Sequence, residues 1–362
     1  MKVKGKPTRT IWLSNDNKTV EIIDQTKLPF EFKTVKLKTF EDTYHAIKEM
    51  LVRGAPLIGV TGAYGLCLAA NQNKNINFIK DAYDHLKSAR PTAVNLSWSL
   101  DRMIEIANDS DKNNIIKNLY EEANKILEED VNFSKNIGKY GSNIIEKIFK
   151  KKNKTINILT HCNAGWLATV DWGTATAPIY TAFNKSIPIH VWVDETRPRN
   201  QGSFLTSWEL REHGVPHTII ADNTGGHLMQ KGEVDIVIVG SDRTTYTGDV
   251  CNKIGTYLKA LSAYDNNVPF YAALPSSTID WSIKNGTDIP IEERNEEEVS
   301  KIKGKNLNGL IEEIQIIPDN TSVKNYAFDV TPRKYVTGII TEKGICGASE
   351  NEILSLFPEK KL

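Results

Sequence analysis

Five short apolar segments recur through the second half of the chain, and they constrain its fold more than any other feature. They are rich in β-branched residues and occupy residues 155–160, 187–193, 216–220, 234–240 and 268–274. Helix-compatible sequence of one to two dozen residues lies between most of them. This alternation is typical of a parallel sheet with helices on both faces. We therefore predict an α/β fold.

The ends of this region are less regular. Two later segments, residues 326–330 and 335–340, are expected to add strands to the same sheet. The segment GVPHTIIADNTGGHL (214–228) lacks room for a long helix, so we expect only a short turn of helix there. From Gly344 onward we expect a C-terminal tail.

A different pattern precedes the sheet region. Residues 10–37 read as short strands joined by turns, with apolar and polar residues alternating as in a half-buried strand. A helix is predicted to begin after Thr39, because Thr39 and Asp42 have the spacing of a capping box. Helical patterns also cover residues 77–89 and 96–150. We predict a smaller α+β domain over residues 1–130 and a sheet domain over residues 131–362.

Polar residues follow four of the predicted strands, at the point where each strand ends. Because parallel strands share one direction, their carboxyl ends meet at one edge, where ligands bind in open α/β sheets. These polar stretches should therefore line one cleft. They are His161-Cys162-Asn163, Asp194 to Gly202, Ala221 to Gly226, and Ser241-Asp242-Arg243.

Cys162 and Asp242 are the candidates for chemistry. Cys162 lies where helix-start N–H groups could lower the pKa of its thiol, although a free cysteine is often only a small buried apolar residue. Asp242 follows a buried strand, and a carboxyl group in an apolar cleft can act as an acid near neutral pH. The alternative for Asp242 is an ion pair with Arg243.

Two places have the character of an anion site. Arg53 stands beside Pro56, which fits the start of a helix rich in small residues, and free N–H groups at a helix start attract anions. Asn252 and Lys253 are predicted to open a second helix and could hold a phosphate there. The alternatives are a structural arginine at a helix–helix turn and simple capping by Asn252. The glycines of the first helix do not match the dinucleotide-binding fingerprint.

Composition excludes several classes of function. Lysine and arginine balance aspartate and glutamate at 45 each, which argues against a dedicated nucleic-acid binder. The four cysteines form no CxxC pair, and no apolar run approaches the roughly 20 residues that span a bilayer. His161, His217 and His227 lack metal-ligand spacing, so structural histidines are expected. We expect a cytoplasmic protein without a metal site and without a membrane segment.

The motifs at these positions resemble those of the methylthioribose-1-phosphate isomerase family, in the family's order and over nearly the whole chain. They are RGAP (53–56), RPTAVN (90–95), THCNAG (160–165), DETRPRNQG (194–202), GSDR (240–243), GDVCNKIGTY (248–257), LPSSTID (274–280), IPIEER (289–294) and FDVTPRKYVTGIITEKG (328–344).

The resemblance implies a Rossmann-like catalytic domain after the N-terminal domain, a homodimer, and no metal or organic cofactor. It implies that Cys162 and Asp242 are the catalytic pair. It implies that a small phosphorylated sugar is bound by Arg53, Gly54, Ala55, Arg90, Gln201, Asn252 and Lys253.

The implied reaction converts 5-methylthioribose 1-phosphate to 5-methylthioribulose 1-phosphate, a step of methionine salvage. Departures from the family's usual pattern leave the substituent at C5 open: Trp166, Val170-Asp171-Trp172, Phe204 and Thr244-Thr245-Tyr246. The main alternative is therefore 5-deoxyribose 1-phosphate, or an enzyme that serves both sugars. A ribose-1,5-bisphosphate isomerase would need another cation for its second phosphate. Regulatory subunits of the translation-initiation nucleotide-exchange factor share the fold but would not need the Cys162–Asp242 pair.

Overall fold

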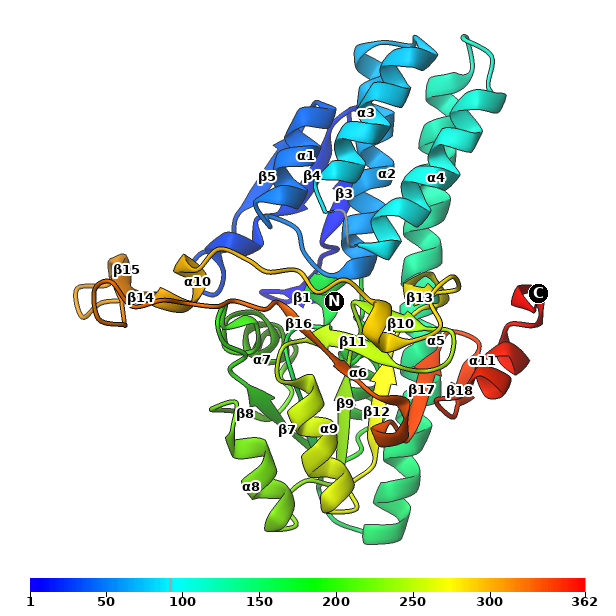
Figure 1. Cartoon of the computed structure of the whole chain (residues 1–362). Helices are drawn as coiled ribbons and strands as arrows, with labels where there is room; N and C mark the ends of the chain where they lie inside the picture. Colours follow the sequence, from blue (N-terminus) through cyan, green and yellow to red (C-terminus); the bar gives the residue numbers. More distant parts are fainter. Residues whose placement is uncertain (91–92, 362) are drawn as a thin grey trace.

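The computed structural model describes residues 1–90 and 93–361, and a large mixed sheet forms the centre of its C-terminal half (Figure 1). Within the described residues this sheet has the strand order β18-β17-β12-β9-β6-β7-β8. All neighbouring strands are parallel except β17 and β18. The strands are β6 (Ile156–Thr160), β7 (Ile189–Asp194), β8 (His217–Ile220), β9 (Ile236–Val239), β12 (Phe270–Ala273), β17 (Gly338–Thr341) and β18 (Gly344–Cys346). The five predicted apolar segments are all strands of this sheet.

Alternate residues of the central strand β9 pack into two different hydrophobic clusters. Ile236 and Ile238 contact one cluster, and Val237 and Val239 contact the other. Because successive side chains of a strand point to opposite faces, the sheet is covered on both faces, as predicted. The covering helices are α6 (Thr176–Asn184), α7 (Ser207–His213), α8 (Thr224–Gln230), α9 (Thr256–Asp265) and the second half of α5 (Ile115–Lys152).

The N-terminal half consists of two small antiparallel sheets, β1-β2 and β3-β4-β5, and a group of helices (Figure 1). The predicted capping box is present, since Thr39 accepts from the Asp42 N–H and the Asp42 carboxylate accepts from the Thr39 N–H. The elements are β1 (Lys2–Val3), β2 (Lys6–Pro7), β3 (Ile11–Leu13), β4 (Val20–Ile23), β5 (Thr34–Leu37), α1 (Phe40–Lys48), α2 (Ala55–Gln72), α3 (Ile76–Ser88) and α4 (Val94–Asp109).

The long helix α5 connects the two halves. Its first part, to Val131, packs in the N-terminal hydrophobic cluster, and its second part, from Ile137, packs against the large sheet. The helix is continuous through residue 130. We propose that the domain boundary lies at this change of packing partner.

Two sequence predictions about strands were wrong. Residues 326–330 were expected in the large sheet, but β16 (Phe328–Thr331) pairs with β11 (Val250–Lys253) in a separate four-stranded sheet, of order β13-β10-β11-β16. The other strands of that sheet are β10 (Arg243–Thr245) and β13 (Ile279–Asp280). Pairing across about 75 residues of chain leaves no local signal, so the sequence did not reveal it.

The predicted C-terminal tail is also wrong. Residues from Gly344 form β18, which covers the edge of the large sheet, followed by α11 (Glu350–Leu356). A strand of three residues is too short for its alternation to be recognised. Nearby, α10 (Glu297–Ser300) leads into the hairpin of β14 (Lys301–Lys305) and β15 (Ile311–Gln315), which projects from the body of the molecule (Figure 1).

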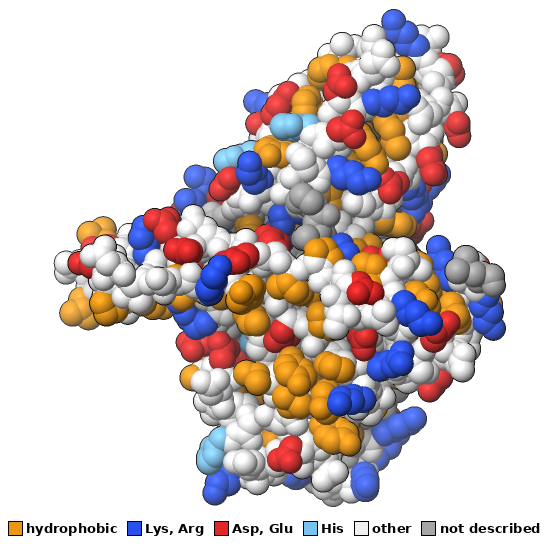
Figure 2. Space-filling model, in the orientation of Figure 1, with side chains coloured by type: hydrophobic (Ala, Val, Ile, Leu, Met, Phe, Trp, Pro, Cys, Tyr) orange, Lys and Arg blue, Asp and Glu red, His pale blue; other side chains and the backbone are white. Residues whose placement is uncertain are grey.

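On the face shown in Figure 2, apolar side chains gather in two places: over α9 and on the β14–β15 hairpin. Leu258 and Tyr264 of α9 and Ile311 and Ile314 of β15 are exposed. Among the described residues, no helix has the length and apolar character needed to cross a membrane.

Candidate active site

The carboxyl ends of the parallel strands meet the start of α2, and together they enclose a buried cavity. The lining residues include eight of the nine that were predicted from the sequence: Arg53, Gly54, Ala55, Arg90, Cys162, Gln201, Asp242 and Lys253. The ninth, Asn252, lines an adjoining small cavity together with Arg53, Cys162 and Asp242. The structure therefore brings all nine residues to one place.

Cys162 lies directly after β6 in a left-handed backbone conformation, with φ of 66°. Its N–H donates to Thr196 Oγ1 at 2.8 Å, and its thiol donates to Gln201 Oε1 at 3.4 Å. Burial raises the pKa of the Cys162 thiol, and the nearby charges of Arg53 and Lys253 oppose this only in part. The expectation of a lowered pKa was wrong, because no α-helix begins at this position and desolvation dominates.

Arg53 is held against the loop that carries Cys162. Its guanidinium donates to Asn163 Oδ1 at 2.5 Å and to the Asn163 carbonyl oxygen at 2.6 Å, and Nη2 lies 4.0 Å from Cys162 Sγ. Gly54 follows with φ of 90°, and a Cβ there would lie 2.5 Å from Ala168. Only glycine permits this close approach, which places Arg53 and the start of α2 over the strand ends.

Asp242 lies at the end of β9 and faces the cationic side of the cavity. Its backbone N–H donates to the Cys251 carbonyl oxygen at 2.9 Å, and its carboxylate acts electrostatically on Arg90, Cys162 and Lys253. Arg243, the alternative partner considered from the sequence, forms an ion pair with Asp280 at 3.4 Å.

Lys253 is a buried lysine at the end of strand β11, and its ammonium lies 4.8 Å from the centre of the Phe328 ring. Burial, and next the charge of Arg294, lower the pKa of Lys253 to about 8. The prediction that Asn252 and Lys253 open a helix was wrong: α9 begins at Thr256, because β11 is extended by its pairing with β16.

Arg294 is a cavity residue that sequence reasoning missed. Its side chain is buried, its Nε donates to Glu292 Oε1 at 3.0 Å, and Arg90 lies 3.6 Å from the other oxygen of that carboxylate. Arg90 Nε is buried and makes no hydrogen bond to a described residue. Pro91 and Thr92 of the RPTAVN motif lie outside the described residues. Arg294 is the last residue of the IPIEER motif, and this motif is the sequence signal that points to it.

A second, larger cavity of about 560 Å³ adjoins the first and shares Met50, Arg53 and Gln201 with it. Phe204 and residues of the β14–β15 hairpin line this outer cavity. The two cavities therefore meet at these three side chains, so the outer one provides space next to the inner one.

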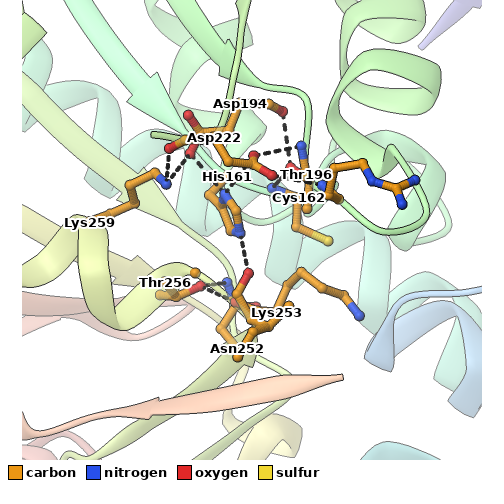
Figure 3. Close-up of polar contacts among 12 residues, drawn as sticks. His161, Cys162, Asp194, Thr196, Asp222, Asn252, Lys253, Thr256 and Lys259 are labelled. Carbon is orange, nitrogen blue, oxygen red and sulfur yellow. Dashed lines mark hydrogen bonds and ion pairs between the residues drawn. The ribbon is translucent and has the colours of Figure 1, made fainter. Parts of the chain in front are cut away.

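A polar network lies beneath the strand ends (Figure 3). Within residues 1–90 and 93–361, one group of His, Cys, Asp and Glu side chains has the spacing for a metal ion: His161, Asp194 and Asp222. The Lys259 ammonium lies 3.3 Å from Asp194 Oδ2 and donates to the Asp222 carbonyl oxygen. Lysine thus already supplies a positive charge to this acidic group.

Comparisons with known proteins agree with this geometry. Residues 51–348 match the model of the initiation factor 2 subunit family. Methylthioribose-1-phosphate isomerase of Paramagnetospirillum magneticum is 58% identical over 99% of this chain and 100% of its own length. The protein of the same name from Rhodospirillum centenum is 55% identical over 99% of this chain and 96% of its own. The chain belongs to the methylthioribose-1-phosphate isomerase family.

Solved structures give the same family and fold. The 5-methylthioribose 1-phosphate isomerase of Pyrococcus horikoshii OT3 has a TM-score of 0.83 and 41% identity, covering 98% of this chain and 97% of its own. A structure named translation initiation factor eIF-2B, subunit delta, from A. fulgidus has a TM-score of 0.81 and 39% identity, covering 97% and 100%. The isomerase family and the initiation-factor subunits therefore share this architecture.

Proposed function

We propose that this chain is an aldose–ketose isomerase that converts 5-methylthioribose 1-phosphate to 5-methylthioribulose 1-phosphate. One observation carries the proposal: a buried cavity places a thiol and a carboxyl group beside several cationic side chains. The relatives that share this chain's full length carry the name of that activity.

The cationic side of the cavity suits a sugar phosphate. Arg53, Arg90, Lys253 and Arg294 line it, while Asp242 and Glu292 supply negative charge. Charged groups interact more strongly in a cavity of low dielectric, so a phosphate dianion that replaces water there gains attraction from all four cations. We assign phosphate binding to Arg53, Arg90 and Lys253, with Gly54, Ala55, Gln201 and Asn252 positioning the sugar.

The reaction requires that the sugar ring opens although phosphate blocks the anomeric oxygen. Asp242 would donate a proton to the ring oxygen and so open the furanose. Hydrogen then moves from C2 to C1 while the C2 hydroxyl becomes a ketone, and the hydroxyl proton passes to the Asp242 carboxylate, which restores the acid. Burial keeps Cys162 as a neutral thiol, so we assign it the stabilisation of the transition state at C1–C2.

The substituent at C5 distinguishes the competing sugars. The outer cavity, with Phe204 and Met50 on its lining, has room for a methylthio group. The same space would admit 5-deoxyribose 1-phosphate, which carries only a hydrogen there. Regulatory subunits of the translation-initiation nucleotide-exchange factor share the fold, but a non-catalytic subunit has no need of a cavity that contains a thiol and a carboxyl group.

The family likeness also supports the finer parts of the proposal. We propose that the protein is a homodimer, acts in the cytoplasm and serves methionine salvage. No metal or organic cofactor enters the proposed steps.

Turnover of three sugars by the wild type and two variants tests the assignment. We expect activity with 5-methylthioribose 1-phosphate, weaker activity with 5-deoxyribose 1-phosphate and none with ribose 1,5-bisphosphate. Cys162→Ser and Asp242→Asn should each lower kcat by roughly 10²- to 10⁴-fold, the usual contribution of a positioned acid or base. Binding of the sugar phosphate should be retained, because neither side chain is assigned to the phosphate.

Matched substitutions control for folding. Cys346→Ser changes a buried thiol on the edge strand β18, and Asp288→Asn changes an exposed carboxyl group. Both should keep wild-type kcat. If Cys162→Ser or Asp242→Asn turned over at the wild-type rate, the assigned catalytic pair would be wrong.

A further inference from the structure

His161 joins two loops that come from distant parts of the chain. It follows β6 directly and precedes Cys162, and its side chain is 1% exposed. Its Nδ1 lies 2.8 Å from Asp194 Oδ2, and its Nε2 lies 2.8 Å from the carbonyl oxygen of Ile254 (Figure 3). Ile254 is the residue after Lys253. One imidazole ring therefore spans from the turn that presents Cys162 to the turn that presents Lys253.

The partners of the ring determine where its protons lie. The Ile254 carbonyl oxygen can only accept a hydrogen bond, so Nε2 must carry a proton to bond it. Asp194 Oδ2 also lies 3.3 Å from the Lys259 ammonium, which favours an ionised carboxylate that accepts from Nδ1. A neutral ring would leave one bare nitrogen facing an oxygen atom. Both contacts are satisfied only when both ring nitrogens are protonated.

We propose that His161 is a positioning residue, held as an imidazolium, which fixes the turn of Cys162 relative to the turn that directly follows Asn252 and Lys253. The role of the two turns rests on the proposed function, in which one holds the reacting centre and the other holds the phosphate. His161 does not line the cavity among the described residues, so it acts through its neighbours.

The charges around the ring come from four elements and support a buried cation. Asp194 ends β7, the Asp222 carboxylate after β8 lies 3.9 Å from Nδ1, Lys259 belongs to α9, and Asp329 belongs to β16. The Asp329 carboxylate interacts electrostatically with His161 and accepts from the N–H groups of Gly255 and Tyr257. Three carboxylates thus face one imidazolium and one ammonium.

The backbone of the Cys162 turn needs external support. Cys162 and Thr196 adopt positive φ of 66° and 64°, and Thr196 Oγ1 bridges the Cys162 N–H to the Asp194 carbonyl oxygen. Gly255 has φ of 100°, and a Cβ on it would lie 3.1 Å from the ring of His161. Positive φ in a residue other than glycine persists only where neighbouring groups hold it. The ring supplies a contact to each turn.

The protonation state is tested on the wild-type protein by ¹⁵N NMR with labelled histidine. We expect the ring of His161, assigned by its proximity to the Gly255 methylene, to show two protonated nitrogens at neutral pH. A spectrum with one unprotonated ring nitrogen at that pH would overturn the imidazolium. This measurement requires neither a variant nor turnover.

Two conservative variants test the positioning role separately. In His161→Gln the side-chain amide reaches toward the Nε2 position and keeps the bond to Ile254, whereas in His161→Asn it lies near the Nδ1 position and loses that bond. We expect His161→Asn to weaken binding of inorganic phosphate by roughly 10- to 100-fold, the effect of a lost hydrogen bond from a charged group. His161→Gln should recover most of this affinity, and His213→Gln should match the wild type.

Steady-state kinetics of the same variants distinguish a failure of the positioning role of His161 from a failure of the proposed function. With 5-methylthioribose 1-phosphate, His161→Asn should raise KM and also lower kcat, and His161→Gln should restore KM more than kcat. Equal phosphate affinity in both variants and the wild type would refute the positioning role. If the wild type turned over no sugar phosphate, the proposed function would fail, while phosphate titration and NMR would still decide the role of His161.

Discussion

The buried ammonium of Lys253 lies near the positive charge of Arg294 and the negative charge of Asp242. Arg294 lowers its pKa further after the effect of burial, and Cys162 and Asp242 raise it less. With a pKa of about 8, Lys253 is charged below that pH and becomes neutral as the pH rises through it. A bound phosphate dianion favours the charged form, so phosphate binding and the Lys253 proton are linked.

At the scale of this residue we predict a pH-dependent KM. KM for the sugar phosphate should be constant below pH 8 and should rise by up to about tenfold per pH unit above it, because one proton is lost from the binding site. Lys253→Arg should remove the rise, since arginine stays charged over this range, and steady-state kinetics from pH 6 to pH 10 measures it. Lys117→Arg, on the exposed face of α5, should behave as the wild type. An unchanged pH profile in Lys253→Arg would show that another group causes the rise.

The sequence predicted those candidate site residues that directly follow a strand or belong to a recognised motif. Cys162 and Asp242 were placed at one sheet edge from strand direction alone, and the cavity contains both. Arg294 was missed because it follows no strand of the large sheet and reaches the cavity from a long connection. The raised pKa of Cys162 was missed as well, since desolvation depends on what covers a side chain.

At the scale of the element, the turn before α2 depends on Gly54. Its φ of 90° disfavours a residue with a Cβ, and that Cβ would lie 2.5 Å from backbone and side-chain atoms of Ala168. We expect Gly54→Ala to lower the free energy of unfolding by roughly 2–4 kcal/mol, from backbone strain and overpacking together. Urea unfolding measures this loss, and KM should also rise because Arg53 is displaced.

Gly214 provides the matched control for this prediction. It has φ of 79° at the end of α7, but a Cβ there would have no neighbour within 4 Å. Gly214→Ala should therefore cost only the backbone strain of about 1–2 kcal/mol. If Gly54→Ala were no more destabilising than Gly214→Ala, the contact with Ala168 would not constrain the turn.

Individual helices and strands were predicted well where the pattern of apolar side chains within the segment itself is long enough to recognise. Helix α1 with its capping box, helix α3 and the parallel strands all follow from nearby residues. The strand β11 was mistaken for a helix start because its extended form depends on β16, a strand about 75 residues away. Local sequence carries propensity, whereas strand pairing is decided by the whole fold.

At the scale of the whole molecule, the cavity is lined by buried side chains from both halves. Arg53 and Arg90 come from the N-terminal half, while Cys162, Gln201 and Lys253 come from the sheet half, and all but Arg90 are at most 9% exposed. A dry site limits exchange of the migrating hydrogen with solvent. We therefore favour direct hydride transfer from C2 to C1 over an enolate intermediate.

The fate of an isotope label tests this prediction. Deuterium placed at C2 of 5-methylthioribose 1-phosphate should be found at C1 of the product by NMR or mass spectrometry. Unlabelled substrate turned over in D₂O should take up no deuterium at C1. Complete loss of the label to solvent would rule out the hydride route.

The amino-acid sequence by itself determined the parallel strands of the large sheet, the edge at which they end, and the position of Cys162 and Asp242 at that edge. These follow from side-chain period and strand direction, which are local properties. Only the tertiary structure decided that Arg294 joins the cavity, that β11 is a strand, and that His161 bridges two turns. Burial, electrostatic neighbours and long-range pairing are set by segments far apart in the chain, so no local pattern records them.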